Sequence, residues 1–336
     1  MNPTIADVAK HCGVSTATVS MVLTNKGRIS TMTRKRVLES VKDLGYVYNQ
    51  AAANLRHKRS NLVGLVTPDI TNPFYSDMIA GLSHYLEEQD SLLFLANAEE
   101  SVERQNKFID SLLSQNAGGV VVCPAMGTDI DFLKTVQGRG FPIVLAVRPL
   151  DEEQFDFVGT NNFMGLQLAT EHLIAKGHKH IAFIGGLKSS RTRSHRLGGY
   201  MSKLMEHGIV FNERYIRSCS ASRTEGAKVT KELLTEHPEI TAIIGYQDIV
   251  AFGVMRGIKH FGKEVGKDIA VVGFDDVAES SDIIPSLTSI SVSAREIGKA
   301  AGAIILARMK GDKQPIKSVV FSPKLIVRNS CGGFVC

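Results

Sequence analysis

The side chains best placed to do chemistry in this sequence are cations and hydrogen-bond donors, and they gather in two places. Residues 1–60 hold ten Lys or Arg against three Asp or Glu, whereas the remainder of the chain is slightly acidic. This imbalance indicates a polyanionic partner at the N-terminal end. A second cluster crowds one loop and helix start, and it comprises Lys188, Arg191, Arg193, His195 and Arg196. It fits either a solvated basic loop or an anionic ligand such as a sugar phosphate.

Catalytic motifs are missing from the sequence. It has no phosphate-binding loop of the P-loop kind, no Gly-x-Ser-x-Gly elbow and no His/Cys/Glu cluster with metal-ligand spacing. The cysteines are scattered, at Cys12, Cys123, Cys219, Cys331 and Cys336. Such spacing favours reduced thiols over a disulfide framework. We therefore expect no enzyme activity, no cofactor and no metal, with residues 331–336 as a frayed tail.

The hydropathy pattern predicts a cytoplasmic protein with no membrane segment. Met1 to Lys10 lacks the cationic stretch and apolar run of a secretory signal, and no later segment has eighteen uninterrupted apolar residues. Two alternatives are a transport binding protein and a sugar-processing enzyme on a doubly wound fold. The first would need an export signal and the second a recognisable catalytic group.

Residues 1–48 predict three short helices. Gly13 ends the first, Ser15 caps the second, and Ser30 or Thr31 caps the third, which runs to Gly45. Their apolar stripes are Ile5, Val8, Ala9 and Cys12, then Val19, Val22 and Leu23, then Val37, Val41 and Leu44. Two helices joined by a tight turn in a basic segment predict an all-α helix-turn-helix headpiece, with an ordinary small helical bundle as the alternative.

The second helix of such a motif enters the major groove of DNA and presents its solvent-facing N-terminal residues to the base edges. Here those residues are Thr16, Ala17, Ser20 and Met21. The alternative for them is ordinary helix surface.

Beyond the headpiece, residues 49–60 form a linker and 61–330 an α/β core. The linker begins with a helix former, Asn49–Arg56, that is too short to be stable alone. In the core, short apolar runs alternate with amphipathic stretches, which predicts two doubly wound parallel-sheet lobes. The expected strands are Leu62–Thr67, Leu92–Ala96, Gly119–Cys123, Pro142–Ala146, Phe157–Gly159, Ile181–Gly185, Tyr215–Ser218, Ala242–Gly245, Ala270–Phe274, Leu287–Val292 and Val319–Val327.

The first lobe is expected at about 61–159 and 291–321, and the second at about 160–290 and 322–330. The late strands would return to the first lobe, so the chain would cross between lobes near Gly159, Ser289 and Ser322. Ligands in such sheets bind outside the carboxyl ends of the strands, which here face the cleft between the lobes.

Several short motifs along the chain are characteristic together. They are Thr4–Ala9, Gly13–Ser15, Thr18–Ser20, Gly45-Tyr46, Asn72–Tyr75, His172–Ile174, Gly177-His178, Arg196–Tyr200 and Val272–Asp276. With these motifs the chain resembles the lactose-repressor/galactose-repressor (LacI/GalR) family of regulators over nearly its whole length. Within the family, Gly27–Ser30, Thr192-Arg193 and Arg196–Tyr200 look most like the maltose-regulon repressor branch. The resemblance implies a periplasmic-binding-protein-like core.

For the DNA site, the resemblance implies that Thr16 and Ala17 form a specificity pair. Met21 departs from the Arg that many members place there, and it offers apolar contact, for instance to a thymine methyl, in place of a bidentate contact to guanine. The phosphate-binding residues implied are Thr4, Ser15, Thr18 and Ser30. The DNA-binding set is completed by Ser20, Asn25, Asn49, Ala52 and Leu55.

The Asn49–Arg56 segment resembles the family's hinge helix, which orders on the operator. Leu55 would be the wedge in the minor groove, at a cost of a few kcal/mol for unstacking a base step. The family's usual Pro before the hinge is Tyr48 here, and a packing role for Leu55 is the alternative.

For the effector, the resemblance implies a sugar or sugar derivative bound between the lobes. Arg196 and Asp275 lie on the best-matched motifs, although Asp275 would also suit a strand-end turn that caps backbone amides. The implied set is Asn72, Phe74, Tyr75, Arg148, Asn161, Arg193, Arg196, Gln247 and Asp275. Three places depart from the usual sugar-binding pattern: Asn161, Gln247 and Ser218–Ser222, which lacks the common aromatic.

The functional expectation is a homodimer that reads a pseudo-palindromic double-stranded DNA operator and represses carbohydrate genes under effector control. After Asn329 the sequence has no leucine heptads, so we expect dimers and not tetramers.

Overall fold

A computed structural model describes residues 3–25, 27–47, 60–150 and 154–332. The chain divides into two compact units, residues 1–60 and 61–336. The predicted hinge residues Asn49, Ala52 and Leu55 lie outside the described residues, so the hinge stays a prediction.

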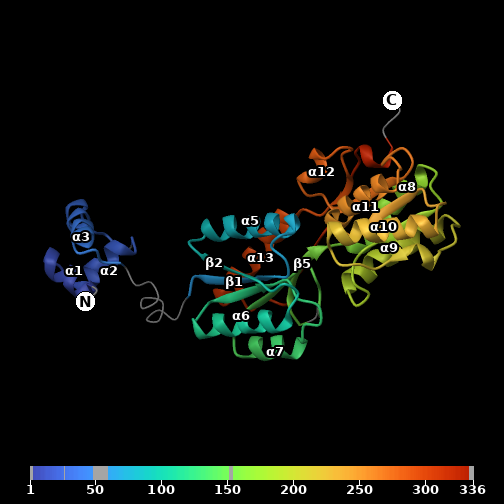
Figure 1. The fold of residues 1–336 in the computed structure, drawn as a ribbon. Coiled ribbons are helices and arrows are strands. Elements are labelled where there is room, and N and C mark those ends of the chain that lie inside the picture. The colour runs from blue at the N-terminus through green and yellow to red at the C-terminus, as the bar shows by residue number, and fades with distance from the viewer. Residues whose placement is uncertain (1–2, 26, 48–59, 151–153, 333–336) are drawn as a thin grey trace. The chain divides into compact units, whose positions relative to one another are not determined.

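The N-terminal unit contains the three predicted helices, α1 (Ile5–Cys12), α2 (Thr16–Leu23) and α3 (Thr31–Asp43) (Figure 1). Ser15 and Ser30 are the N-caps of α2 and α3, which decides between Ser30 and Thr31. Gly13 ends α1 with a left-handed backbone, at a φ of 62° that glycine adopts without strain. The fully buried side chains of Val8, Val19 and Val37 join the three helices in one apolar core.

The second unit is built on two six-stranded sheets. The first has the strand order β11-β5-β4-β3-β1-β2 and is parallel throughout. Its strands are β1 (Leu62–Thr67), β2 (Leu92–Asn97), β3 (Gly119–Val122), β4 (Ile143–Ala146), β5 (Asp156–Thr160) and β11 (Ser318–Phe321). Every residue of β3 and β4 is buried, as expected for central strands covered on both faces.

The second sheet has the order β12-β10-β9-β8-β6-β7 and is parallel except for the antiparallel pair β10–β12. Its strands are β6 (Ile181–Ile184), β7 (Ile216–Arg217), β8 (Ala242–Gly245), β9 (Ala270–Asp275), β10 (Thr288–Ser291) and β12 (Lys324–Ile326). Each sheet with its helices forms one lobe, so the predicted pair of doubly wound lobes is confirmed.

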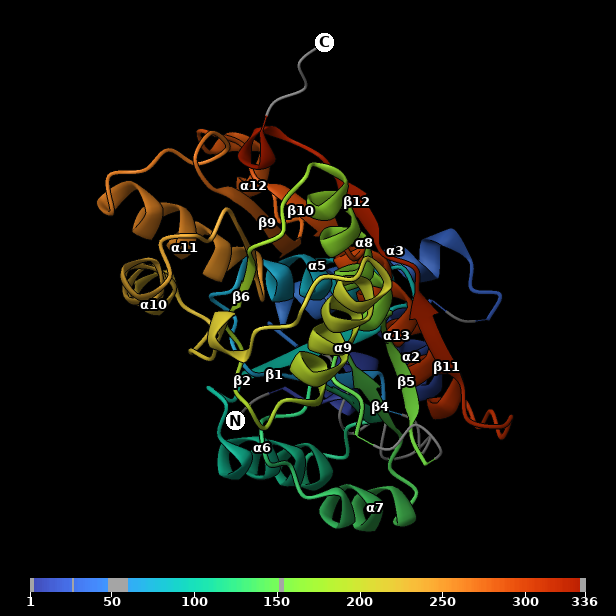
Figure 2. The same ribbon diagram turned by 90° about the vertical axis from the view of Figure 1, so that its right-hand side faces the viewer.

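Helices cover both faces of each sheet. In the first lobe α5 and α13 lie on one face and α6 and α7 on the other (Figure 1), and in the second lobe α8 and α9 lie opposite α10 and α11 (Figure 2). Their bounds are α5 (Pro73–Glu87), α6 (Val102–Ser114), α7 (Ile130–Gly138), α8 (Asn162–Ala175), α9 (Arg191–Glu206), α10 (Arg223–Glu236), α11 (Asp248–His260), α12 (Glu279–Asp282) and α13 (Ala294–Met309). Two short 3₁₀ turns are η1 (Glu213–Tyr215) and η2 (Asn329–Cys331). None of the helices in the described ranges is long and apolar enough to cross a bilayer.

The chain passes between the two sheets three times: after β5, after β10, and between β11 and β12. The single strand predicted over Val319–Val327 is therefore wrong, because the segment divides into β11 in one sheet and β12 in the other. Pro323 lies at the break and has no backbone N–H to continue a ladder. Among the late strands only β11 returns to the first sheet, together with α13, whereas β10 and β12 belong to the second.

The C-terminal end is also more ordered than predicted. Cys331, expected in a frayed tail, is 2% exposed and lies in η2. Its Sγ lies 3.1 Å from Nε2 of His172 and 3.0 Å from Oγ1 of Thr288. The packing of η2 against β9 and β10 buries this residue. Cys336 lies outside the described residues.

Candidate functional site

The start of α2 presents the residues predicted to read DNA. Thr16, Ala17 and Met21 are exposed and Ser20 is half-buried, at positions that share one helix face. Ser15 fixes the start of this helix, because its Oγ accepts from the backbone N of Thr18 at 3.1 Å. The helix can therefore offer these four side chains together.

The side chain of Met21 leans toward the loop that follows α2. A Cβ at Gly27 would lie 3.0 Å from the Met21 Sδ, and Gly27 has a φ of 79°. Asn25, also predicted to contact DNA, is exposed and its Oδ1 accepts from Nη1 of Arg34 at 2.5 Å.

The predicted phosphate contacts lie at helix starts. Thr4, Ser15 and Ser30 are exposed N-caps of α1, α2 and α3, and Thr18 is half-buried in the first turn of α2. A helix N-terminus favours anions, because its unpaired N–H groups and dipole point toward the ligand. The N-termini of α1, α2 and α3, in a unit rich in Lys and Arg, are therefore suited to bind the phosphate groups of a DNA backbone.

In the second unit, Asp275 is the last residue of β9 and combines a buried carboxyl with an uncommon backbone conformation. Its side chain is buried, its backbone φ is 120°, and its Oδ2 has no hydrogen-bond partner within the described part of the chain. Burial raises the pKa of Asp275 well above its ordinary value, opposed by the charge of Arg196 and a hydrogen bond from Gln247. A carboxyl oxygen held in this way can form a hydrogen bond with a ligand hydroxyl.

Arg196 on α9 is buried, and two of its guanidinium nitrogens are hydrogen-bonded. Its Nε donates to Oδ1 of Asn162 at 2.8 Å, and its Nη1 donates to the carbonyl of Tyr246. Its guanidinium carbon lies 3.5 Å from the centroid of the Phe274 ring. The fork therefore has a fixed orientation before any ligand arrives.

These residues line one small cavity with side chains from both lobes. The lining comprises Phe74, Val147, Thr160, Asn162, Arg196, Gln247, Asp275, Val292 and Ile297. Four predicted effector residues are among them: Phe74, Arg196, Gln247 and Asp275. An aromatic face, a fixed guanidinium, a carboxyl and an amide are groups that recognise hydroxyls. The cavity measures about 10 Å³, so a sugar ring fits there only if the lobes open.

The other predicted effector residues lie outside this lining. Tyr75 is buried with its ring 5.2 Å from that of Phe74, and burial raises its pKa. Asn72 caps α5 and accepts from the backbone N of Phe74 at 3.1 Å, whereas Asn161 is exposed and caps α8 by accepting from the backbone N of Met164. It is the following residue, Asn162, that faces the cavity.

The basic cluster at the start of α9 divides into two groups. Lys188, Arg191 and His195 are exposed, whereas Arg193 and Arg196 are buried. Arg193 donates from Nε to the carbonyl of Gly185 at 3.0 Å. Three members of this cluster are therefore solvated, and only Arg196 lines the cavity.

Arg148, the remaining predicted residue, forms a bidentate ion pair with Glu100. Their bonds are 2.9 Å, from Nη1 to Oε2, and 2.7 Å, from Nη2 to Oε1. Sequence reasoning missed Glu100, because 48 residues separate the partners and nothing in the local pattern of Glu100 links it to the site.

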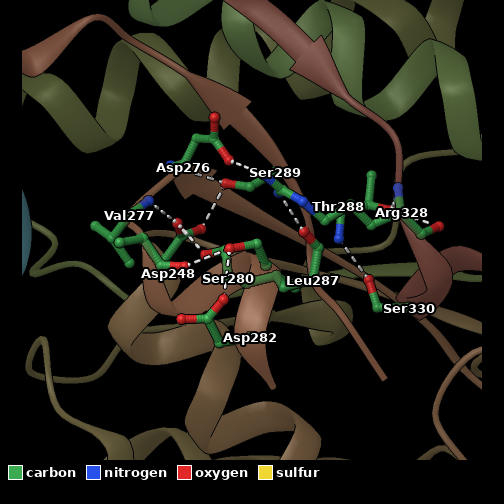
Figure 3. A network of polar contacts seen from close by, with 12 residues as sticks. Asp248, Asp276, Val277, Ser280, Asp282, Leu287, Thr288, Ser289, Arg328 and Ser330 are labelled. Atoms are coloured by element: carbon green, nitrogen blue, oxygen red, sulfur yellow. Dashed lines mark hydrogen bonds and ion pairs between the residues drawn. The ribbon is translucent and has the colours of Figure 1, made fainter. Parts of the chain in front are cut away.

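A buried network supports the turn that carries Asp275. Figure 3 shows Asp248 receiving hydrogen bonds from the backbone N of Val277 at 2.9 Å and from Oγ of Ser280 at 2.8 Å and of Ser289 at 2.6 Å. Ser289 in turn accepts from the backbone N of Asp276. These bonds hold a backbone of positive φ at Asp275 and Asp276, a conformation that persists only where its surroundings enforce it.

One group outside the cavity has metal-ligand chemistry among the described residues, Glu171, Glu206 and His207. The ammonium of Lys203 lies 3.1 Å from Glu171 and 2.8 Å from Glu206. The ammonium of Lys203 therefore already pairs with both carboxylates of this group.

Comparison with known proteins places this geometry among regulators. Residues 4–49 match the family described as bacterial regulatory proteins, lacI family, and residues 60–325 match periplasmic binding proteins and sugar binding domain of LacI family. The maltose regulon regulatory protein MalI of Escherichia coli (strain K12) is 33% identical, over 96% of this chain and 97% of its own length. The ribose operon repressor of Halalkalibacterium halodurans is 31% identical, over 98% and 97%.

Solved structures agree over the same length. The lac repressor dimer bound to operator and the anti-inducer ONPF superposes with a TM-score of 0.88 at 27% identity, covering 99% of this chain and 100% of that one. The complex of the transcriptional regulator CelR with cellobiose has a TM-score of 0.75 at 28% identity, covering 98% and 99%.

Proposed function

The chain belongs to the LacI family of bacterial regulatory proteins, and on that premise we propose that it is a DNA-binding repressor of carbohydrate genes controlled by a sugar or sugar derivative. Its similarity to MalI supports placement in the maltose-regulon branch of the family. The observation that carries the proposal is the pairing of a basic helix-turn-helix unit with the cavity at the carboxyl end of β9, where Asp275 keeps an acceptor oxygen unpartnered.

On the DNA side, Thr16, Ala17, Ser20 and Met21 read bases from α2, since all four lie on one face of the helix. The capped starts of the three helices bind phosphates. Asn49, Ala52 and Leu55 supply the hinge contact to the minor groove, as the family resemblance predicts.

On the effector side, Asp275 accepts from ligand hydroxyls and Gln247 donates or accepts beside it. Arg196 donates from a guanidinium held by Asn162, and Phe74 supplies the apolar platform. The cavity is lined from both lobes, so a ligand there contacts α5 and α9 together and can bias the arrangement of one lobe against the other.

The operating unit is a homodimer on a pseudo-palindromic operator. A solved relative at 27% identity is a dimer bound to operator, and matched half-sites require two headpieces related by two-fold symmetry. The protein acts in the cytoplasm, where DNA is accessible, and carries out no catalysis, because the cavity contains fixed binding groups and no activated nucleophile.

The test is selection of binding sites from random double-stranded DNA by the full-length protein, followed by a reporter assay of the recovered site. The proposal expects a pseudo-palindrome bound by one dimer, and reporter expression that rises when the gene is deleted. Recovery of no consensus sequence would contradict sequence-specific binding, and lower expression after deletion would contradict repression.

A further inference from the structure

The ion pair between Arg148 and Glu100 joins three loops at the carboxyl ends of strands of the first sheet. Glu100 follows β2, Arg148 follows β4, and Nη1 of Arg148 also donates to the carbonyl of Pro124, after β3, at 3.0 Å. Glu100 Oε2 accepts as well from the backbone N of Met126 at 3.1 Å. Both terminal nitrogens of Arg148 and both oxygens of Glu100 are thus engaged with each other.

The pair lies on the first-lobe side of the effector cavity. Val147, which precedes Arg148, lines that cavity, and Arg148 is close enough to interact electrostatically with Tyr75 of the first lobe and Tyr246 of the second. Glu100 and Val147 have φ values of 57° and 67°, so the backbone is held in a conformation unusual for such residues on both sides of the pair.

Both partners keep their charge there. The Arg148 side chain is 20% exposed and that of Glu100 40%. Burial pushes the pKa of Glu100 upward, but the hydrogen bonds and positive charge of Arg148 hold it below its ordinary value. The pair is therefore a carboxylate and a guanidinium with no net charge.

The other buried cations near the cavity belong to the second lobe, and each is already partly engaged. Arg196 donates to Asn162 and Tyr246 and faces the carboxyl of Asp275, and Arg193 donates to Gly185. A phosphate needs a cation with free, convergent donors. In the first lobe such a group would exist if Arg148 were released from Glu100.

We propose that Glu100 is a specificity-determining residue: by holding Arg148 in a bidentate pair, it restricts the effector to uncharged sugars and excludes sugar phosphates. This inference rests on the proposed effector site and names the class of ligand that the site accepts. A phosphorylated ligand would have to break the pair and would leave the Glu100 carboxylate beside a second anion.

The test is titration of inorganic phosphate into the full-length protein by calorimetry at fixed ionic strength. The variants are Glu100→Gln, Arg148→Gln and the double variant Glu100→Gln/Arg148→Gln. The matched control is Glu99→Gln, since Glu99 is the adjacent residue and pairs with the exposed Arg104 at 2.7 Å. Phosphate that binds the basic headpiece contributes equally to every variant and cancels in the comparison.

Glu100→Gln is expected to bind phosphate at least tenfold more tightly than the wild type, and the double variant is expected to lose that gain. Wild type, Arg148→Gln and Glu99→Gln should be indistinguishable. If the Glu100→Gln variant folds but binds phosphate no more tightly than the wild type, the proposal is wrong. If that variant does not fold, the comparison of wild type with Arg148→Gln decides, because a tenfold loss of phosphate affinity in Arg148→Gln would show that the wild-type guanidinium already binds anions.

Release of operator DNA by sugars is measured separately on the same proteins. Loss of all sugar response in the wild type would contradict the proposed sensor function, whereas the phosphate titration would still report on Glu100. If glucose 6-phosphate released operator DNA from the wild type at a lower concentration than any uncharged sugar, the site would accept a sugar phosphate. That result would contradict the role proposed for Glu100 and leave the sensor function standing.

Discussion

The guanidinium carbon of Arg196 lies 3.5 Å from the centroid of the Phe274 ring, so the cation stacks on the residue that precedes Asp275. This contact joins α9 to the end of β9 and aligns a donor fork beside an acceptor carboxyl. Both groups are therefore oriented at the strand end before a ligand binds. The cavity between them measures about 10 Å³, far less than a sugar ring, so a ligand there requires the lobes to separate.

Arg196→Lys should abolish most of the effector response while operator affinity stays within twofold. Lysine lacks the planar fork that bonds Asn162 and stacks on Phe274, and losing a charge-assisted hydrogen bond costs about 1.5–3 kcal/mol. Anisotropy of labelled operator DNA with and without sugar measures both quantities. Arg191→Lys, at an exposed position on the same helix, is the control and should respond as the wild type does.

Asp275→Asn should change how thermal stability depends on pH. The pKa of Asp275 is raised by burial above its unfolded value, so its protonated form favours the folded state, and that contribution is lost as pH rises through the folded-state pKa. Asparagine cannot ionise. The melting temperature of Asp275→Asn relative to the wild type should therefore increase as pH rises above about 4, and a difference that stays constant with pH would show that Asp275 does not titrate in this way.

Met21→Arg should change the preferred operator base at one position in each half-site toward guanine. Met21 is 36% exposed on the face of α2 that we propose to read bases, and a good bidentate contact contributes about 1–3 kcal/mol of discrimination. Binding-site selection measures the change. Met32→Arg adds the same charge at an 82% exposed position of α3, so a matching change of preference there would assign the effect to charge alone.

Gly298→Ala should destabilise the core by about 1–3 kcal/mol, the usual cost of overpacking. A Cβ at Gly298 on α13 would clash with the backbone oxygen of Met78 on α5. Gly138→Ala at the end of α7 adds the same methyl where no atom lies within 4 Å and should have little effect. Urea denaturation with an unchanged m-value is the measurement, and equal stability of the two variants would contradict the close helix contact.

The sequence predicts local features of this fold well and long-range pairings poorly. Helix stripes and caps depend on neighbours three or four residues away, so the predictions for Gly13 and Ser15 are confirmed, and Ser30 is one of the two predicted caps of the third helix. The break between β11 and β12 had a local signal in Pro323, but which sheet each half joins depends on the packing of distant segments.

The same distinction applies to the site. Motifs located Phe74, Arg196 and Asp275, whereas the choice between Asn161 and Asn162 depends on which of two adjacent side chains caps α8. Adjacent positions in a helix point in different directions, so a shift of one residue moves a side chain from the cavity to the surface.

The central claim is that a sugar bound beside Arg196 and Asp275 sets the affinity for DNA. Its most direct test is anisotropy of labelled operator DNA, at fixed salt, titrated with wild-type or Asp275→Asn protein in the presence of uncharged mono- and disaccharides. We predict that at least one sugar shifts the wild-type operator affinity tenfold, about 1.4 kcal/mol of coupling, and that Asp275→Asn binds DNA normally but loses this shift. An equal shift in both proteins, or none in the wild type, would contradict the account.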